Sequence, residues 1–273
     1  MFRGITATDG VCRSSMRTVS CTRYVTPLRE GGSVPAIVEA DDCGMYVAKF
    51  CGAAQGVRAL AAEVIAAQLA KHLGLPIPDT ALIDLPQQLV TAEPDPELQD
   101  LLKASVGLNF AIDYLPGALV YDPAAKRPVS SRLASQVVWF DAWLTNIDRT
   151  AKNTNLLWWH GKLWLIDHGA SLYIHHTWQD PQRHAEGRFA AIAKHVLLQH
   201  ASELATAHAA LSARIDKAAL VAALGEVPDA WLPAHEAFAD VHAQRAAYVD
   251  YLLHRLSHGG FVEEAQHAYA ALV

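Results

Sequence analysis

The sequence predicts an α+β fold of two lobes, in which a β-rich N-terminal lobe precedes a mainly helical C-terminal lobe. Segments rich in β-branched residues and separated by turn residues occupy positions 17–50, as expected of short strands. A helical period follows at positions 57–73, and the chain from position 185 onward is rich in Ala and Leu, which favours helices. Strands gathered at one end and helices at the other are typical of this class.

The composition indicates a folded protein. Of the 273 residues, 52% are hydrophobic and 18% are charged, which argues against disorder. The formal net charge of −6 lacks the basic excess that favours direct nucleic-acid binding. No uninterrupted apolar stretch is long enough to cross a bilayer. The four cysteines form no CxxC pair, so we expect reduced thiols and a cytoplasmic protein.

We expect three parts along the chain. Residues 1–16 show no periodicity and lack the apolar centre of a secretory signal, so we interpret them as a flexible leader. Met16 stands just before the first strand-like segment, and translation starting at Met1 or at Met16 stays open. Residues 17–115 form the expected N-terminal lobe and residues 116–273 the expected C-terminal lobe.

The first elements are predicted to be strands of an antiparallel meander. Residues 17–26, 34–39 and 45–50 are the three strand-like segments. Turn residues separate them, with Gly31-Gly32-Ser33 before the second strand and Asp41-Asp42-Cys43-Gly44 before the third.

A helix over 57–73 is predicted next. Leu60, Val64, Leu69 and Leu73 fall near one face, and Gly74 with Pro76 ends the helix. Residues 78–85 and 109–115 are predicted to be the last strands of the first lobe.

The second lobe is expected to begin with a helix and a hairpin. Residues 131–144 carry a helical apolar pattern, and residues 155–166 alternate around a turn at His160-Gly161. We interpret the tryptophans of this hairpin as its core: Trp158, Trp159 and Trp164. The remainder is mostly helical, with breaks at 225–228 and 258–260.

Polar residues cluster in the loop between this helix and the hairpin. The loop carries Asp148 and Asn153, and Asp167 stands just after the second hairpin strand. Because a hairpin returns the chain to its starting place, we expect these three side chains to converge. Two carboxylates and an amide oxygen suit a hard cation such as Mg²⁺, as metal-assisted phosphoryl transfer requires.

The spacing and order of these motifs resemble those of kinases. Four residues separate Asp148 from Asn153, as in the kinase catalytic loop, and Asp167-His168-Gly169 stands where kinases carry Asp-Phe-Gly. Upstream, Tyr46-Val47-Ala48-Lys49 resembles the strand that carries the ATP-binding lysine. The amino-acid sequence of the loop that carries Asp148 and Asn153 is similar to that of the HipA-like kinases, within the protein-kinase-like and phosphoinositide-kinase-like superfamily. We expect a short form of that family, without the extra N-terminal portion of HipA toxins.

The resemblance implies a protein-kinase-like fold that uses ATP and Mg²⁺. By the same resemblance, Lys49 binds the α- and β-phosphates of ATP and forms an ion pair with Glu63. Asp148 orients or deprotonates the acceptor hydroxyl, and Asn153 and Asp167 hold the metal ions.

Further nucleotide contacts follow from the resemblance. The turn at Gly31, Gly32 and Ser33 lies over the phosphates, and the connector that includes Asp113, Tyr114 and Leu115 meets the adenine. In the catalytic loop, Lys152 and Arg149 either stabilise charge on the γ-phosphate or face water. We take Lys152 as the catalytic candidate of the two. The histidines are interpreted mostly as surface or helix-face residues.

The function implied is transfer of the ATP γ-phosphoryl group to a hydroxyl, with Ser or Thr of a protein as the expected acceptor. Two alternatives stay open. One is a kinase acting on a small molecule or a lipid headgroup, since the catalytic core is shared. The other is a nucleotide-binding pseudokinase or scaffold.

Overall fold

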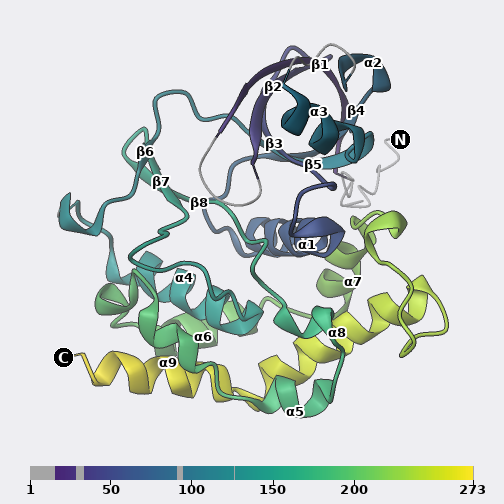
Figure 1. The fold of residues 1–273 in the computed structure, drawn as a ribbon. Coiled ribbons are helices and arrows are strands. Elements are labelled where there is room, and N and C mark those ends of the chain that lie inside the picture. The colour runs from purple at the N-terminus through teal and green to yellow at the C-terminus, as the bar shows by residue number, and fades with distance from the viewer. Residues whose placement is uncertain (1–15, 29–33, 91–94, 126, 273) are drawn as a thin grey trace, which may run out of the picture.

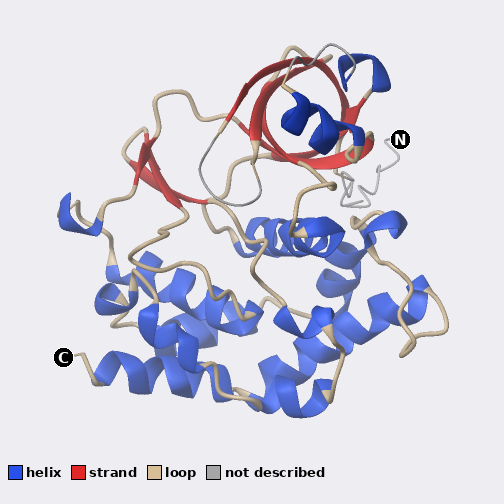
Figure 2. Ribbon diagram, in the orientation of Figure 1, coloured by secondary structure: helices blue, strands red, loops and turns tan. Residues whose placement is uncertain are grey.

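The computed structural model describes residues 16–28, 34–90, 95–125 and 127–272 of the chain. Strands gather in the N-terminal part and helices in the C-terminal part (Figures 1 and 2). The predicted α+β class, with a strand-rich region followed by a helical one, is confirmed.

Five strands of the N-terminal part close into a barrel in the order β1-β2-β3-β5-β4. Their bounds are β1 (Thr18–Pro27), β2 (Ala36–Ala40), β3 (Met45–Lys49), β4 (Thr80–Leu85) and β5 (Gly107–Asp113). The predicted antiparallel pairing of the first three strands is confirmed. The closure was not predicted, because it comes from parallel pairing of β1 with β4. A parallel pair needs a long crossover, and the segment between these strands contains β2, β3 and a helix.

That helix, α1 (Gly56–Leu73), lies beneath the barrel (Figure 1). It ends at Gly74, whose φ of 72° is left-handed, and this end was predicted. The prediction of one apolar face was too narrow. The helix is buried on almost every side because β5 packs against it from the barrel and α7 packs against it from the helical part. The helix contains many alanines, and their small side chains allow both β5 and α7 to pack closely against it.

Alternate residues of β4 divide between two cores, as the period of a strand requires. Ala81 and Ile83 belong to the barrel interior, whereas Leu82 packs into the core that α1 shares with the helices. The barrel therefore has an apolar core of its own and an outer face that packs against α1.

Two short helices, α2 (Gln87–Val90) and α3 (Pro96–Lys103), cover the barrel and were not predicted (Figure 1). The Asp95 carboxylate accepts hydrogen bonds from the backbone N–H groups of Glu97 and Leu98, and proline follows Asp95 at the first helical position. Asp-Pro is a helix-start signal, but the segment is too short for an apolar period to stand out.

The C-terminal part is built from helices joined by short 3₁₀ turns. The helices are α4 (Ser131–Leu144), α5 (Pro181–Glu186), α6 (Leu204–Ser212), α7 (Lys217–Gly225), α8 (Val241–His258) and α9 (Gly260–Ala270). The turns are η1 (Pro123–Ala125), η2 (Tyr173–His176), η3 (Ala190–Lys194), η4 (Leu198–His200) and η5 (Asp229–Trp231). The predicted helix over 131–144 and the breaks after 225 and 258 are confirmed. None of the described helices is long and apolar enough to span a membrane.

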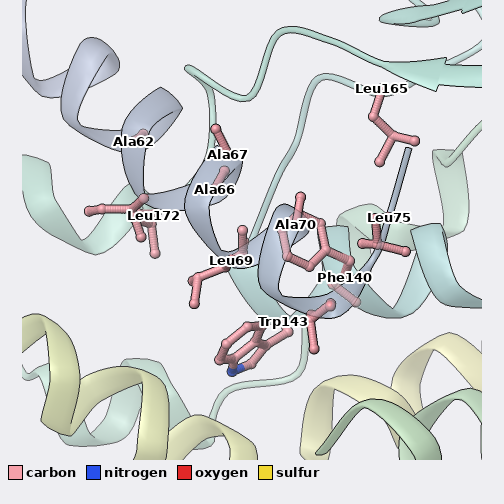
Figure 3. Close-up of a cluster of buried hydrophobic side chains, with 14 of the residues drawn as sticks. Ala62, Ala66, Ala67, Leu69, Ala70, Leu75, Phe140, Trp143, Leu165 and Leu172 are labelled. Atoms are coloured by element: carbon pink, nitrogen blue, oxygen red, sulfur yellow. The ribbon is translucent and has the colours of Figure 1, made fainter. Parts of the chain in front are cut away.

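The main core lies between α1 and α4. Leu69 of α1 and Trp143 and Phe140 of α4 lie together in it, with Leu172 and Leu165 at its margins (Figure 3). All five are fully buried. This packing fixes α4, and with it the loop that follows α4, against the helix beneath the barrel.

The predicted hairpin is confirmed as β7 (Leu156–Trp159) and β8 (Lys162–Leu165), with β6 (Leu119–Val120) paired to β7. His160 and Gly161 both have positive φ, of 46° and 73°, as a tight primed turn requires. The hairpin tryptophans, which were predicted to be core, are only partly buried, although Trp158 packs against the main core and Trp159 packs against Trp164. The fully buried tryptophans are Trp139 and Trp143 of α4.

Candidate active site

Lys49, the last residue of β3, brings three elements together. Its ammonium donates a short hydrogen bond to Glu63 Oε1 on α1 and lies 2.8 Å from Asp167 Oδ1, just after β8. The side chain of Lys49 is nearly buried, whereas that of Asp167 is 35% exposed. The lysine of the strand, the glutamate of the helix and the aspartate after the hairpin therefore meet, as the sequence predicts.

Glu63 also holds the segment that carries Asp167. Its carboxylate accepts hydrogen bonds from the backbone N–H of His168 at 3.0 Å and of Gly169 at 2.9 Å. A Cβ at position 169 would stand 3.2 Å from Glu63 Oε1, so the close approach explains the glycine. Lys49 was the predicted partner of Glu63, and this second contact was not predicted.

Charge and burial act against each other in this group. Burial lowers the pKa of Lys49, but the carboxylates of Glu63 and Asp167 outweigh burial and raise it overall. Burial raises the pKa of Asp167, but Lys49 outweighs burial and leaves it below its usual range. Burial also raises the pKa of Glu63 against the opposing effect of Lys49. A charged ammonium beside a charged Asp167 is the state that follows.

Asp148 lies in the loop after α4 and makes hydrogen bonds within that loop. Its Oδ2 accepts from Asn153 Nδ2 at 2.8 Å and from Asn155 Nδ2 at 3.4 Å, and its backbone N–H donates to Asn146 Oδ1 at 3.1 Å. Burial and the charge of Asp167 raise the pKa of Asp148, although the two asparagines oppose this. A raised pKa makes a carboxylate a better proton acceptor near neutral pH.

The backbone takes uncommon conformations on both sides of the hairpin. Asn155 before β7 and Asp167 after β8 have φ values of 48° and 54°. These values lie in the left-handed region, which residues other than glycine rarely adopt. The Asn155 side chain reaches Asp148, whereas the Asp167 carboxylate reaches Lys49. Ile166 N–H donates to the Asn155 carbonyl and keeps the two strand ends together.

Arg149 corrects the sequence-based prediction. We expected it to stabilise phosphate charge or to face water, but it is 1% exposed and its Nε donates to Asp141 Oδ2 at 2.6 Å. Lys152 and Asn153, in contrast, are exposed. Asp141 itself was missed, although a carboxylate in the apolar stretch of α4 is the kind of signal that indicates a buried partner.

The interpretation of the histidines was also wrong for three of them. His168, His175 and His195 are buried. His168 Nε2 contacts Arg149 Nη2 at 2.9 Å, and His195 Nε2 contacts Asp141 Oδ2 at 2.9 Å. Burial, followed by Arg149, lowers the pKa of His168 to about 3, so this ring is neutral.

The other residues predicted to contact the nucleotide are Gly31, Gly32, Ser33, Asp113, Tyr114 and Leu115, and their contact with a nucleotide stays a prediction. Gly31, Gly32 and Ser33 lie outside the described residues. Asp113 is the last residue of β5 and Tyr114 is the next residue along the chain. Their N–H groups donate to the carbonyls of Asp79 and Met45, respectively. Leu115 comes next and is buried.

The donor set determines which ion fits. Asp167, Asp148 and Asn153 offer carboxylate and amide oxygens, which suit Mg²⁺. Among the described residues, no group of three or more His, Cys, Asp or Glu side chains is placed to hold a metal ion. An ion here would therefore complete its shell with phosphate oxygens and water, as Mg²⁺ does in phosphoryl-transfer sites.

The fold is kinase-like. A crystal structure of a Helicobacter pylori proinflammatory kinase, CtkA, is similar to the chain with a TM-score of 0.53 and 12% sequence identity. The match covers 95% of this chain and 98% of that one. At this identity the likeness concerns the fold, and the predicted two-lobed kinase-like fold is confirmed. No curated protein sequence matches the chain.

The family follows from a second comparison. The family model of the HipA-like kinases matches residues 22–265. The chain belongs to the HipA-like kinase family, as its motifs indicated.

Proposed function

We propose that the protein is an active ATP-dependent kinase that transfers the γ-phosphoryl group to a hydroxyl, with nucleotide bound between the lobes formed by residues 17–115 and 116–273. The observation that carries the proposal is the contact of Lys49 with both Glu63 and Asp167. A scaffold has no chemical need to keep a buried ammonium beside a partly exposed carboxylate.

Each residue has a role in the proposed reaction. The ammonium of Lys49 binds the α- and β-phosphates, and Glu63 keeps it in position. Asp167 and Asn153 hold the metal, and bound Mg²⁺ supplies charge neutralisation at the phosphates. The exposed ammonium of Lys152 is proposed to lie near the γ-phosphate, where cationic charge stabilises the transition state.

Asp148 is the proposed acceptor-positioning residue. Its carboxylate accepts the proton of the hydroxyl as the new O–P bond forms and as the bond between the γ-phosphorus and the ADP oxygen breaks. The hydrogen bonds from Asn153 and Asn155 orient the carboxylate for this step. Its raised pKa favours proton transfer.

We propose a Ser or Thr hydroxyl of a protein as the acceptor, on the strength of the HipA-like family. The alternative of a small-molecule or lipid-headgroup acceptor is tested by the same assay. Protein, Mg²⁺ and γ-labelled ATP are incubated with lysate, and label is measured in protein and in small-molecule fractions. We expect label in protein, and label confined to small molecules would overturn this acceptor.

Variants test the roles. Asp148→Ala should keep Mg²⁺-dependent ATP binding but lower turnover by about a hundredfold or more. Asp167→Asn should weaken ATP binding in the presence of Mg²⁺ and leave it unchanged with EDTA. Asp122→Ala, in an exposed loop, is the control. Wild-type protein that binds ATP without any transfer, in the presence of lysate, would favour the pseudokinase alternative.

A further inference from the structure

A buried carboxylate lies directly behind the catalytic loop. Asp141 of α4 is 0% exposed. Its Oδ1 accepts from Asn146 Nδ2 at 2.9 Å, and its Oδ2 accepts from Arg149 Nε at 2.6 Å. Asn146 in turn accepts from the backbone N–H of Asp148. Asp141 thus holds the residues on both sides of Asp148 without contacting Asp148 itself.

Arg149 also contacts the segment that carries Asp167. Its Nη1 donates to the carbonyls of Asn155 and Ile166, the latter at 3.2 Å, and its Nη2 lies 2.9 Å from His168 Nε2. Arg149 directly follows Asp148 in the chain, whereas Ile166 and His168 flank Asp167. One planar guanidinium therefore joins the neighbours of the two site carboxylates.

His195 braces the same carboxylate from a distant segment. The backbone N–H of Leu197 donates to His195 Nδ1 at 3.1 Å, so the proton of the neutral ring is on Nε2, which donates to Asp141 Oδ2. The backbone of this segment also pairs with the loop, because Val196 N–H donates to the Arg149 carbonyl at 3.1 Å.

Stability alone does not account for this arrangement. Burying an ion pair removes both charges from water, and an apolar pair of similar volume often gives equal or greater stability. The planar fork of arginine, however, provides several donors in a fixed geometry that apolar residues and lysine cannot reproduce. What the pair uniquely provides is a rigid link between two loops.

We propose that Asp141 is a positioning residue that, through Arg149 and with His195 as an outer brace, sets the placement of Asp148 relative to Asp167. The inference rests on the proposed kinase function. Loss of the link should misplace the carboxylates by a fraction of an ångström to about 1 Å, which is enough to lower turnover by about a hundredfold.

The test compares two buried arginines. Arg149→Lys keeps a positive charge beside Asp141 but loses the planar guanidinium with its several N–H donors. Arg255→Lys is the matched control, because Arg255 is also 1% exposed. It donates to backbone carbonyls of α4 and of residues 185–187, and not to the loop of Asp148 or the segment of Asp167. For each variant we measure kcat, KM for ATP, the thermal midpoint, and ATP affinity by calorimetry with Mg²⁺ and with EDTA.

The expected result separates positioning from stability. Both variants should lower the thermal midpoint. Arg149→Lys alone should lower kcat by at least about tenfold and weaken ATP binding with Mg²⁺ while leaving binding with EDTA unchanged. Equal kcat and equal Mg²⁺-dependent affinity in the two variants, for equal amounts of folded protein, would overturn the inference.

A second pair keeps the test decisive if Arg149→Lys does not fold. His195→Gln retains an N–H donor that reaches Asp141, whereas His195→Ala does not. We expect Gln to recover at least half of the kcat that Ala loses, and equal losses would contradict the brace. Asp148→Ala identifies the source of failure. If it stays fully active, the kinase assignment of Asp148 fails. If it is inactive while Arg149→Lys and His195→Ala match wild type, only the positioning inference fails.

Discussion

Lys49 Nζ lies 2.8 Å from Asp167 Oδ1, although one residue ends a strand of the barrel and the other follows the hairpin of the helical part. The contact joins the two parts of the chain between which we propose that the nucleotide binds. It also means that Lys49 balances two carboxylates at once, since Glu63 accepts from the same ammonium. This dependence makes the site sensitive to change at a single residue.

Replacing Lys49 by Met should affect both binding and stability. Loss of a charge-assisted contact to the phosphates should weaken ATP binding by about tenfold to a hundredfold. Glu63 would lose its buried counter-ion, which costs about 3–5 kcal/mol. Calorimetry and denaturant unfolding measure the two effects.

A double variant separates them. Lys49→Met with Glu63→Gln removes the uncompensated charge and should recover much of the stability but none of the binding. Lys71→Met is the control and should bind ATP normally, because Lys71 lies near the C-terminal end of α1 and its side chain is partly exposed. Recovery of ATP affinity in the double variant would contradict the role of Lys49.

Gly169→Ala tests the close packing behind the site. The new Cβ would stand 3.2 Å from Glu63 Oε1, so the Glu63 carboxylate must shift slightly from the position in which it contacts Lys49 and the Gly169 N–H. We expect ATP binding to weaken by about tenfold. Gly225→Ala meets no atom within 4 Å and should be neutral or stabilising by up to about 1 kcal/mol. Unchanged affinity in Gly169→Ala would show that Glu63 does not need its present position.

The pH dependence of turnover follows from Asp148. Because burial and Asp167 raise its pKa, turnover should fall on acidification at a pH above the usual range of an aspartate. The carboxylate is active when deprotonated, so the rate increases with pH through that pKa. Single-turnover rates under saturating ATP measure it. In Asp148→Asn the residual rate should lose this acidic limb, and a limb that persists belongs to another group.

The pH dependence of stability follows from the buried histidines. Burial lowers the pKa of His175 to about 3, so below about pH 6.5 the unfolded chain binds a proton that the folded chain does not. The free energy of unfolding therefore decreases as pH falls, by about 1 kcal/mol per pH unit for such a residue. His175→Asn should reduce the slope by that amount, whereas exposed His160→Asn should not. Denaturant midpoints between pH 7.5 and pH 5 measure it.

The convergence of Asp148 and Asp167 was predictable because both lie at the ends of elements that the local sequence marks. Gly74 ends α1, and the His160-Gly161 turn defines a hairpin whose two ends must meet. Once the hairpin is known, Asp148 and Asp167 are neighbours by geometry alone. The contact of Lys49 with Glu63 was predictable only through the resemblance to HipA-like kinases.

The rest depends on contacts that local pattern does not encode. The parallel pairing of β1 with β4 joins strands far apart in sequence. The burial of Arg149 was not predictable from its loop, because its partner Asp141 lies in a helix and its other contacts lie across the hairpin. A charged residue in a loop is usually solvated, and only the fold reverses that expectation.

The placement of α1 has a consequence for how the molecule comes apart. Because this one helix packs against both β5 and α7 and is buried between them, the unfolding of either part would expose apolar surface of α1 to water. Unfolding should therefore be a single cooperative event rather than two. Any opening of the proposed nucleotide site would in turn have to occur without separating α1 from β5 or from α7.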